Sequence, residues 1–228
     1  MPAVPVAAAT IMLLREVSGA PEVLMLERHA KSEFLPDLYV FPGGRVEPGD
    51  HELADRVGGL TSEQAMQRAH SVDPAAALGF FVAAIRETFE EAGVLLARRR
   101  GERSLVSGAL VDELGAHRLA MQQGAKSLRE IVEEYDLELA GDRLCVHGHW
   151  ITPEIVPHRF DTLFFTAAAP AGQRAAHDGV EAIVESSRQR RVVPITPQLT
   201  GSGDERKLVI PSDAGYPLTE DKLELPGR

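Results

Sequence analysis

Three glutamates with helical spacing are the residues of this sequence best suited to chemistry. Glu87, Glu90 and Glu91 stand at positions i, i+3 and i+4, so a helix would place their carboxylates on one face. Carboxylates this close repel one another, and a divalent cation would turn that repulsion into binding; an all-oxygen ligand set favours Mg²⁺ or Mn²⁺ over zinc. Arg86 could pair with Glu90 one turn later. The alternative is an ordinary solvated helix face, because acidic pairs are common on helices.

The elements around these glutamates have clear start and stop signals. Pro74 suits the first turn of a helix over residues 75–92, and Gly93 suits its end. The apolar side of that helix is expected to pack on a sheet. Upstream, Phe41 and Pro42 precede Gly43 and Gly44, which allow close backbone approach, so a carbonyl of this loop could join a metal shell or contact a phosphate.

The rest of the chain predicts an α+β fold with a mixed sheet. Helical spacing over 51–73 and over 105–135, the latter broken near Gly115 and Gly124, indicates two helical regions. From residue 186 onward the chain is polar and rich in proline, which leaves little room for long elements. Strands are expected at 4–14, 22–28, 38–41, 144–151, 159–168 and 180–184.

In this order the residues resemble the signature of the Nudix hydrolase superfamily. Gly44 fits its first glycine, Asp50 stands where the family has its first glutamate, and residues 86–94 fit its second half, with Thr88 in place of an aliphatic residue. Between Asp50 and Arg86 the chain carries 28 residues more than the pattern has. The resemblance implies a single domain over 1–228, an α/β/α sandwich with helical insertions at about 51–78 and 98–140 and an irregular tail at about 186–228.

The resemblance also implies cleavage of a diphosphate by metal-activated water. Glu87, Glu90, Glu91 and the Gly44 carbonyl would hold Mg²⁺ or Mn²⁺, with Glu87 or Glu91 as the base and Arg86 orienting the carboxylates. A further acid is expected from three candidate positions: Asp50, Asp178 and Glu181.

Residues 28–44 resemble the branch of peroxisomal coenzyme A diphosphatases and their bacterial relatives, which carries a comparable insertion. Arg28 fits the coenzyme A signature, but Glu33 and Asp37 stand where an arginine and a glycine are expected. Coenzyme A or an acyl-coenzyme A is therefore the favoured substrate, with ADP-ribose, NADH or a non-catalytic nucleotide-sensing module as alternatives. Substrate contacts are expected from Arg28, Gly43, Gly44 and Arg159.

The composition of the chain limits the kinds of partner that the protein is expected to bind. The 228 residues carry 24 basic and 34 acidic side chains, a net charge of −10, which argues against a broad basic surface for nucleic acid. The longest apolar run, 75–85, is too short to cross a bilayer, and the single Cys145 allows no internal disulfide. A cytoplasmic small-molecule enzyme is expected, with the helical insertions as a candidate homodimer interface. The only tryptophan, Trp150, is expected in the core.

Overall fold

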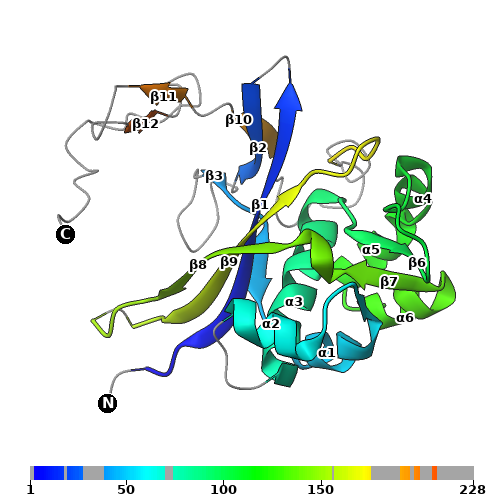
Figure 1. Cartoon of the computed structure of the whole chain (residues 1–228), viewed down its shortest axis with the longest axis horizontal. Coiled ribbons are helices and arrows are strands. Elements are labelled where there is room, and N and C mark those ends of the chain that lie inside the picture. Colours follow the sequence, from blue (N-terminus) through cyan, green and yellow to red (C-terminus); the bar gives the residue numbers. More distant parts are fainter. Residues whose placement is uncertain are drawn as a thin grey trace.

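A mixed sheet forms the centre of the fold. The computed structural model describes residues 3–17, 20–27, 39–69, 74–155, 157–175, 191–195, 198–200 and 207–209. Strand β1 (Val6–Val17) runs parallel to β9 (Phe160–Ala168) and antiparallel to β2 (Ala20–Glu27), which confirms the mixed sheet. The strand order is β10-β2-β1-β9-β8, with β8 at Cys145–Ile151 and β10 at Arg191–Ile195. Figure 1 shows the long strands β1 and β9 crossing the middle of the molecule.

Two short strands bring the glycine segment against the sheet. Strand β4 (Gly43–Arg45) pairs antiparallel with the first half of β1, where Gly44 lies opposite Ala9. Strand β3 (Tyr39–Val40) pairs with the end of β2. The segment that begins at Tyr39 therefore turns back along the sheet and places both glycines beside β1.

Helix α3 (Pro74–Ala92) is the central helix of the fold. Its predicted bounds are confirmed, and Gly93 follows with a φ of +65°, the left-handed conformation that ends helices at glycine. Its middle is buried on every side, since the five consecutive residues 81–85, which cover more than one full turn, are all inaccessible to solvent. A helix buried all round must be covered from several directions, and here the sheet covers one side and the inserted regions cover others.

The two inserted regions fold together. The first contains α1 (Pro48–Glu52), a 3₁₀ turn at Leu53–Arg56, β5 (Val57–Gly58) and α2 (Ser62–Ala69). The second contains β6 (Ala97–Arg99), α4 (Gly108–Glu113), α5 (Gly115–Gln122), α6 (Leu128–Glu134) and β7 (Leu137–Ala140), followed by a 3₁₀ turn at Gly141–Arg143. Strands β5, β7 and β6 form a three-stranded sheet, so the regions are not purely helical as predicted.

A buried ion-pair network holds this second sheet. Arg98 is only 5% exposed and bonds to Glu138 (Nε to Oε1, 2.7 Å) and to Asp142. Gly58 and Gly59 lie so close to these carboxylates that a Cβ at either position would overlap them. The pairing of β5 with β7 ties the first inserted region to the second, and this network lies beside it.

The two faces of the main sheet differ in what covers them. One face, through Ile11, Leu13 and Phe165, shares a single core with the buried apolar residues of the helices. The other face carries Val23 and Met25 in a small cluster with Met12, Tyr39 and Phe41. Within the described residues, helices cover only the first face, so only one helical layer of the expected α/β/α sandwich is seen.

Three expectations need correction or lie outside the described residues. The proline-rich tail is not wholly irregular, because β10 adds an edge strand to β2, with Pro194 in it, and β11 (Gln198–Thr200) pairs with β12 (Lys207–Val209). Trp150 is 65% exposed on β8 and is not a core residue. The strand expected at 180–184 lies outside the described residues. Among the described helices none has the length and apolarity needed to cross a membrane.

Candidate active site

Arg86 is the hub of the candidate site. Its guanidinium donates from Nε to Asp50 Oδ1 at 2.8 Å and from Nη2 to Asp50 Oδ2 at 3.0 Å, a bidentate pair in which Asp50 is 1% exposed. Nη1 donates to Glu87 Oε1 at 2.9 Å and lies 3.5 Å from Glu90 Oε2, so the predicted pairing with Glu90 is confirmed. Arg86 therefore pairs with three carboxylates, and its bidentate partner is Asp50.

Asp50 is also held by a hydrogen bond within its own helix. It lies in α1, and its Oδ2 accepts a hydrogen bond of 2.8 Å from the Glu47 backbone N–H, which closes a capping box at the start of that helix. A residue buried in this way faces Arg86 rather than open solvent. The structure thus gives Asp50 the geometry of an anchor for Arg86, while its part as an additional acid stays a prediction.

The glycine segment contacts two of the glutamates. The Gly43 N–H donates to Glu91 Oε2 at 3.1 Å, and the Gly44 Cα faces the carboxylate of Glu87. A Cβ added at Gly44 would lie 2.1 Å from Glu87 Oε1, so only glycine fits there without moving that carboxylate. The close backbone approach predicted for Gly43 and Gly44 is confirmed, and the Gly44 carbonyl as a metal ligand stays a prediction.

Burial makes the charge on two glutamates costly. Burial raises the pKa of Glu90 to about 7 even though the nearby Arg86 lowers it. Burial likewise raises the pKa of Glu87, again against the opposing effect of Arg86. For Arg86 itself, burial disfavours the charge, but Asp50, Glu87 and Glu90 outweigh it and raise its pKa. The site therefore holds more negative charge than one guanidinium offsets.

The donor set fits a hard divalent cation. Glu87, Glu90 and Glu91 offer oxygen ligands only, which suits Mg²⁺ or Mn²⁺, and a cation would relieve the cost of ionising Glu87 and Glu90. As the side chains stand, no three His, Cys, Asp or Glu residues within the described ranges gather around one point, and Glu87 is turned toward Arg86. The fit is therefore one of ligand type, shared helix face and unbalanced charge.

The apolar side of α3 accommodates the departure from the Nudix pattern at Thr88. This residue is fully buried, and its Oγ1 donates to the Ala84 carbonyl at 2.6 Å. A buried hydroxyl that bonds to the carbonyl four residues earlier leaves no polar group unsatisfied. Thr88 can therefore replace an aliphatic side chain in the core behind the glutamates.

The structure does not place the remaining predicted residues beside the acidic end of α3. Arg159 donates from Nε to the Thr152 carbonyl at 2.9 Å and from Nη1 to the Ala3 carbonyl at 2.8 Å, where it joins the β8–β9 hairpin to the start of the chain. Its substrate contact stays a prediction. Three further candidates lie outside the described residues: Arg28, Asp178 and Glu181.

Three residues of the site carried no signal in the sequence. The Arg45 carbonyl accepts from Arg86 Nη2 at 2.8 Å, and the Glu47 N–H donates to Asp50. Arg118, on α5, bonds to the end of α3. Backbone contacts have no residue-type signature, and Arg118 lies far along the chain in a helix that the Nudix pattern does not cover.

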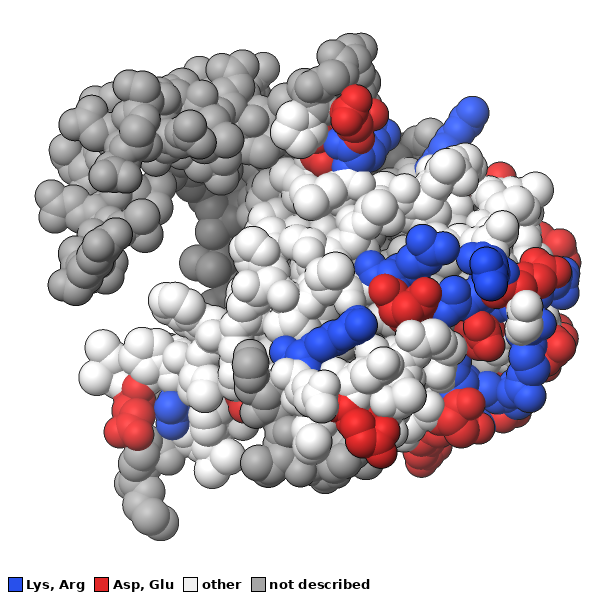
Figure 2. Space-filling model, in the orientation of Figure 1, with Lys and Arg blue, Asp and Glu red and all other residues white. Residues whose placement is uncertain are grey.

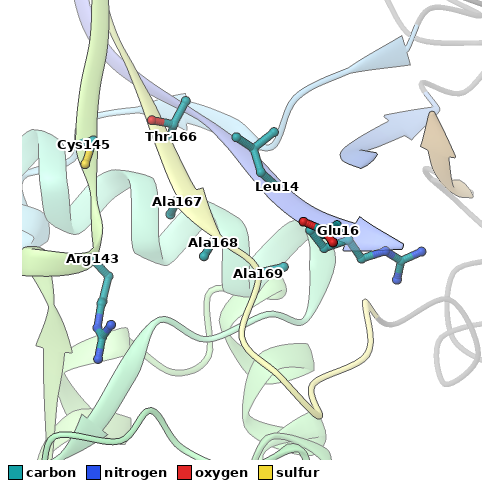
Figure 3. Close-up of a pocket in the computed structure, with 9 residues that line it drawn as sticks. Leu14, Glu16, Arg143, Cys145, Thr166, Ala167, Ala168 and Ala169 are labelled. Atoms are coloured by element: carbon teal, nitrogen blue, oxygen red, sulfur yellow. The ribbon is translucent and has the colours of Figure 1, made fainter. Parts of the chain in front are cut away.

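A separate pocket of about 480 Å³ opens at the carboxyl ends of β1 and β9. Figure 3 shows Leu14, Arg143, Cys145 and Ala168 among its lining residues, and no predicted site residue is among them. On the face shown in Figure 2, basic and acidic side chains are intermixed over the helices at the right, rather than forming one basic field. Neither feature competes with the acidic helix as the candidate site.

A solved structure has a fold similar to that of this chain. A NUDIX hydrolase from Alicyclobacillus acidocaldarius superposes with a TM-score of 0.56 at 27% sequence identity, covering 76% of this chain and 72% of that one. The chain also matches the family described as NUDT19 Nudix domain over residues 4–189. Because that match spans most of the sequence, the chain belongs to this Nudix family.

Curated relatives support the same family assignment. The acyl-coenzyme A diphosphatase NUDT19 of Xenopus laevis is 26% identical over an alignment of 192 positions that covers 70% of this chain and 50% of that protein. The putative nudix hydrolase 7 of Caenorhabditis elegans is 29% identical over 158 residues, 69% of this chain and 42% of that protein. The chain thus spans about half the length of the curated relatives it matches.

Proposed function

We propose that this chain is a metal-dependent diphosphatase that hydrolyses the diphosphate of a nucleotide-type substrate, with coenzyme A or an acyl-coenzyme A favoured. One observation carries the proposal: Arg86 is held by buried Asp50 and in turn holds Glu87, while Glu90 and Glu91 share the same end of α3. Burying charged groups in this way costs stability, and groups with pKa values perturbed by such burial are concentrated at functional sites. Family membership and the named activity of the Xenopus relative support the same assignment.

The proposed chemistry is attack of water on a phosphorus atom. Bound Mg²⁺ or Mn²⁺, with Glu87, Glu90, Glu91 and the Gly44 carbonyl as ligands, would activate the water and neutralise charge on the phosphoryl oxygens. Glu87 or Glu91 accepts the proton of the attacking water. The water oxygen bonds to phosphorus as the bridging oxygen leaves with the other phosphate.

The chain's own residues prepare this step. Arg86 fixes the orientation of Glu87, and the Gly43 N–H fixes one oxygen of Glu91. The bidentate pair with buried Asp50 holds the Arg86 guanidinium away from solvent. Preorganisation of this kind removes the cost of arranging charged groups at the moment of reaction.

Product identification is the direct test. We would incubate the protein with coenzyme A, acetyl-coenzyme A, ADP-ribose and NADH, each with Mg²⁺ or Mn²⁺, and identify products by liquid chromatography and mass spectrometry. The proposal expects adenosine 3′,5′-bisphosphate and 4′-phosphopantetheine or its acyl form from the first two. Cleavage of only ADP-ribose or NADH would assign the enzyme to those substrates instead of coenzyme A. Tight binding of a nucleotide without turnover would favour a sensing module.

Matched variants separate chemistry from folding. Glu91→Gln and Glu87→Gln keep side-chain volume but remove a proton acceptor and a charged ligand. Full turnover by both variants would contradict the assigned site. Loss of turnover with an unchanged unfolding midpoint would support it.

The wider setting is also part of the proposal. The protein is expected to act in the cytoplasm on a small molecule, without nucleic acid or membrane as a partner, and to form a homodimer through the inserted regions. Static light scattering tests the dimer, because a monomer mass at micromolar concentration contradicts it.

A further inference from the structure

The end of α3 is capped by a residue from outside the Nudix motif. The last carbonyls of a helix have no partner within the helix and must find one elsewhere. Arg118, which is 8% exposed, donates from Nε to the Glu90 carbonyl at 3.0 Å and from Nη2 to the Glu91 carbonyl at 3.2 Å. Both acceptors belong to residues whose side chains form the acidic face.

The contact comes from one helix of the second inserted region. Arg118 and Gln122 are four residues apart on α5, and the Gln122 side-chain amide also donates to the Glu90 carbonyl. A planar guanidinium that bridges two successive carbonyls fixes the direction of the last turn as well as its position. A positive charge at a helix carboxyl end also interacts favourably with the helix dipole.

We propose that Arg118 is a positioning residue for the acidic helix, through which the second inserted region fixes the carboxylates of Glu90 and Glu91. The proposal rests on the function proposed above, since those carboxylates are its metal ligands. The second inserted region, which lies outside the Nudix motif, then has a role in the site: Arg118 of α5 fixes the last turn of α3.

The direction in which Mn²⁺ affinity changes on replacing Arg118 distinguishes a positioning role from an effect of its charge alone. Arg118 is a cation near the acidic face, so loss of its charge alone would reduce repulsion and tighten the binding of Mn²⁺. Loss of positioning has the opposite effect, because the ligands on the last turn become free to move. A weaker Mn²⁺ midpoint in Arg118→Met therefore points to positioning.

The experiment uses the full chain with two readouts besides activity. The Mn²⁺ midpoint is measured from metal-dependent thermal stabilisation, and amide hydrogen exchange is followed in peptides covering residues 86–95. For Arg118→Met we expect a Mn²⁺ midpoint weaker on the order of tenfold and faster exchange in those peptides, with Arg118→Lys intermediate because it keeps one donor group. Wild-type or tighter Mn²⁺ binding by Arg118→Met would overturn the proposal.

A matched control removes another buried arginine of the same inserted region. Arg98 pairs with Glu138 and Asp142 of the small sheet, so Arg98→Met should destabilise that sheet without weakening the Mn²⁺ midpoint. Equal weakening in Arg98→Met and Arg118→Met would overturn the assignment. If Arg118→Met does not fold, Arg118→Lys and Gln122→Ala are tested in its place. Wild-type amide hydrogen exchange at residues 86–95 in both of these variants refutes the proposal.

The test also distinguishes this proposal from the proposed function. Amide exchange at 86–95 needs neither metal nor substrate. A wild-type protein that neither binds Mn²⁺ nor cleaves a diphosphate would refute the proposed function, and the exchange data would still decide whether Arg118 fixes the helix end.

Discussion

The buried pair between Asp50 and Arg86 makes the sharpest prediction about this fold. Asp50→Asn keeps the shape of the side chain and an oxygen for the Glu47 N–H, but it removes the charge that faces Arg86. Breaking a buried ion pair from one side costs about 3–5 kcal/mol. Arg86 keeps Glu87 and the Arg45 carbonyl as partners, so we expect a smaller loss of about 2–3 kcal/mol.

Thermal unfolding measures this loss. For a chain of this size about 2–3 kcal/mol corresponds to a decrease in the unfolding midpoint of roughly 4–12 °C. Asp55→Asn is the control, because Asp55 pairs with Arg129 at the surface and its side chain is 62% exposed. An exposed pair contributes about 0–1 kcal/mol, so this variant should stay near the wild-type midpoint.

The same variant has a catalytic consequence. With Asp50 neutral, Arg86 is held less firmly and Glu87 loses its fixed orientation. We therefore expect a lower kcat at temperatures where Asp50→Asn is fully folded. An Asp50→Asn protein with the wild-type midpoint and the wild-type kcat would refute the view that this pair anchors the site.

Three further predictions concern the acidic face. Gly44→Ala must displace the carboxylate of Glu87, so we expect kcat to fall on the order of a hundredfold, whereas Gly49→Ala, whose Cβ meets nothing within 4 Å, should keep the wild-type rate in the same assay. Glu91→Gln should lower kcat by about 10²–10⁴ in the same assay while urea unfolding stays unchanged, and equal losses of activity and stability would argue against a catalytic role. Because burial raises the pKa of Glu90 from 4.5 to about 7, the metal-free protein should lose stability as pH rises through this window, by about 1–2 kcal/mol after allowance for solvent screening. Mg²⁺ should restore that stability above pH 7, as judged by unfolding midpoints, and a Glu90→Gln variant with the wild-type pH profile would contradict the assignment.

Short-range spacing predicted the acidic helix well. The bounds 75–92, the end at Gly93 and the shared face of Glu87, Glu90 and Glu91 all follow from helix geometry, which depends on neighbours three and four residues apart. The strands β1, β2, β8 and β9 are also predicted from the sequence, because their β-branched and aromatic residues have strand character. These features needed no contact between distant parts of the chain.

Elements of two to four residues could not be predicted in the same way. Strands β5, β6 and β7 are too short to show a period of two, and they pair with one another only in the folded chain, where Arg98 also bonds to Glu138 and Asp142. The exposure of Trp150 likewise depends on which strand forms the edge of the sheet. Local sequence holds no information about that choice.

The sequence by itself determined which residue types could do chemistry and the face of the helix that carries them. Tertiary structure decided how they are held: Asp50 meets Arg86 across 36 residues of chain, Gly44 meets Glu87, and Arg118 closes the end of the helix from an inserted region. The physical reason is range. Helix periodicity acts between near neighbours, whereas a buried charge finds its partner only when the folded chain brings distant residues together.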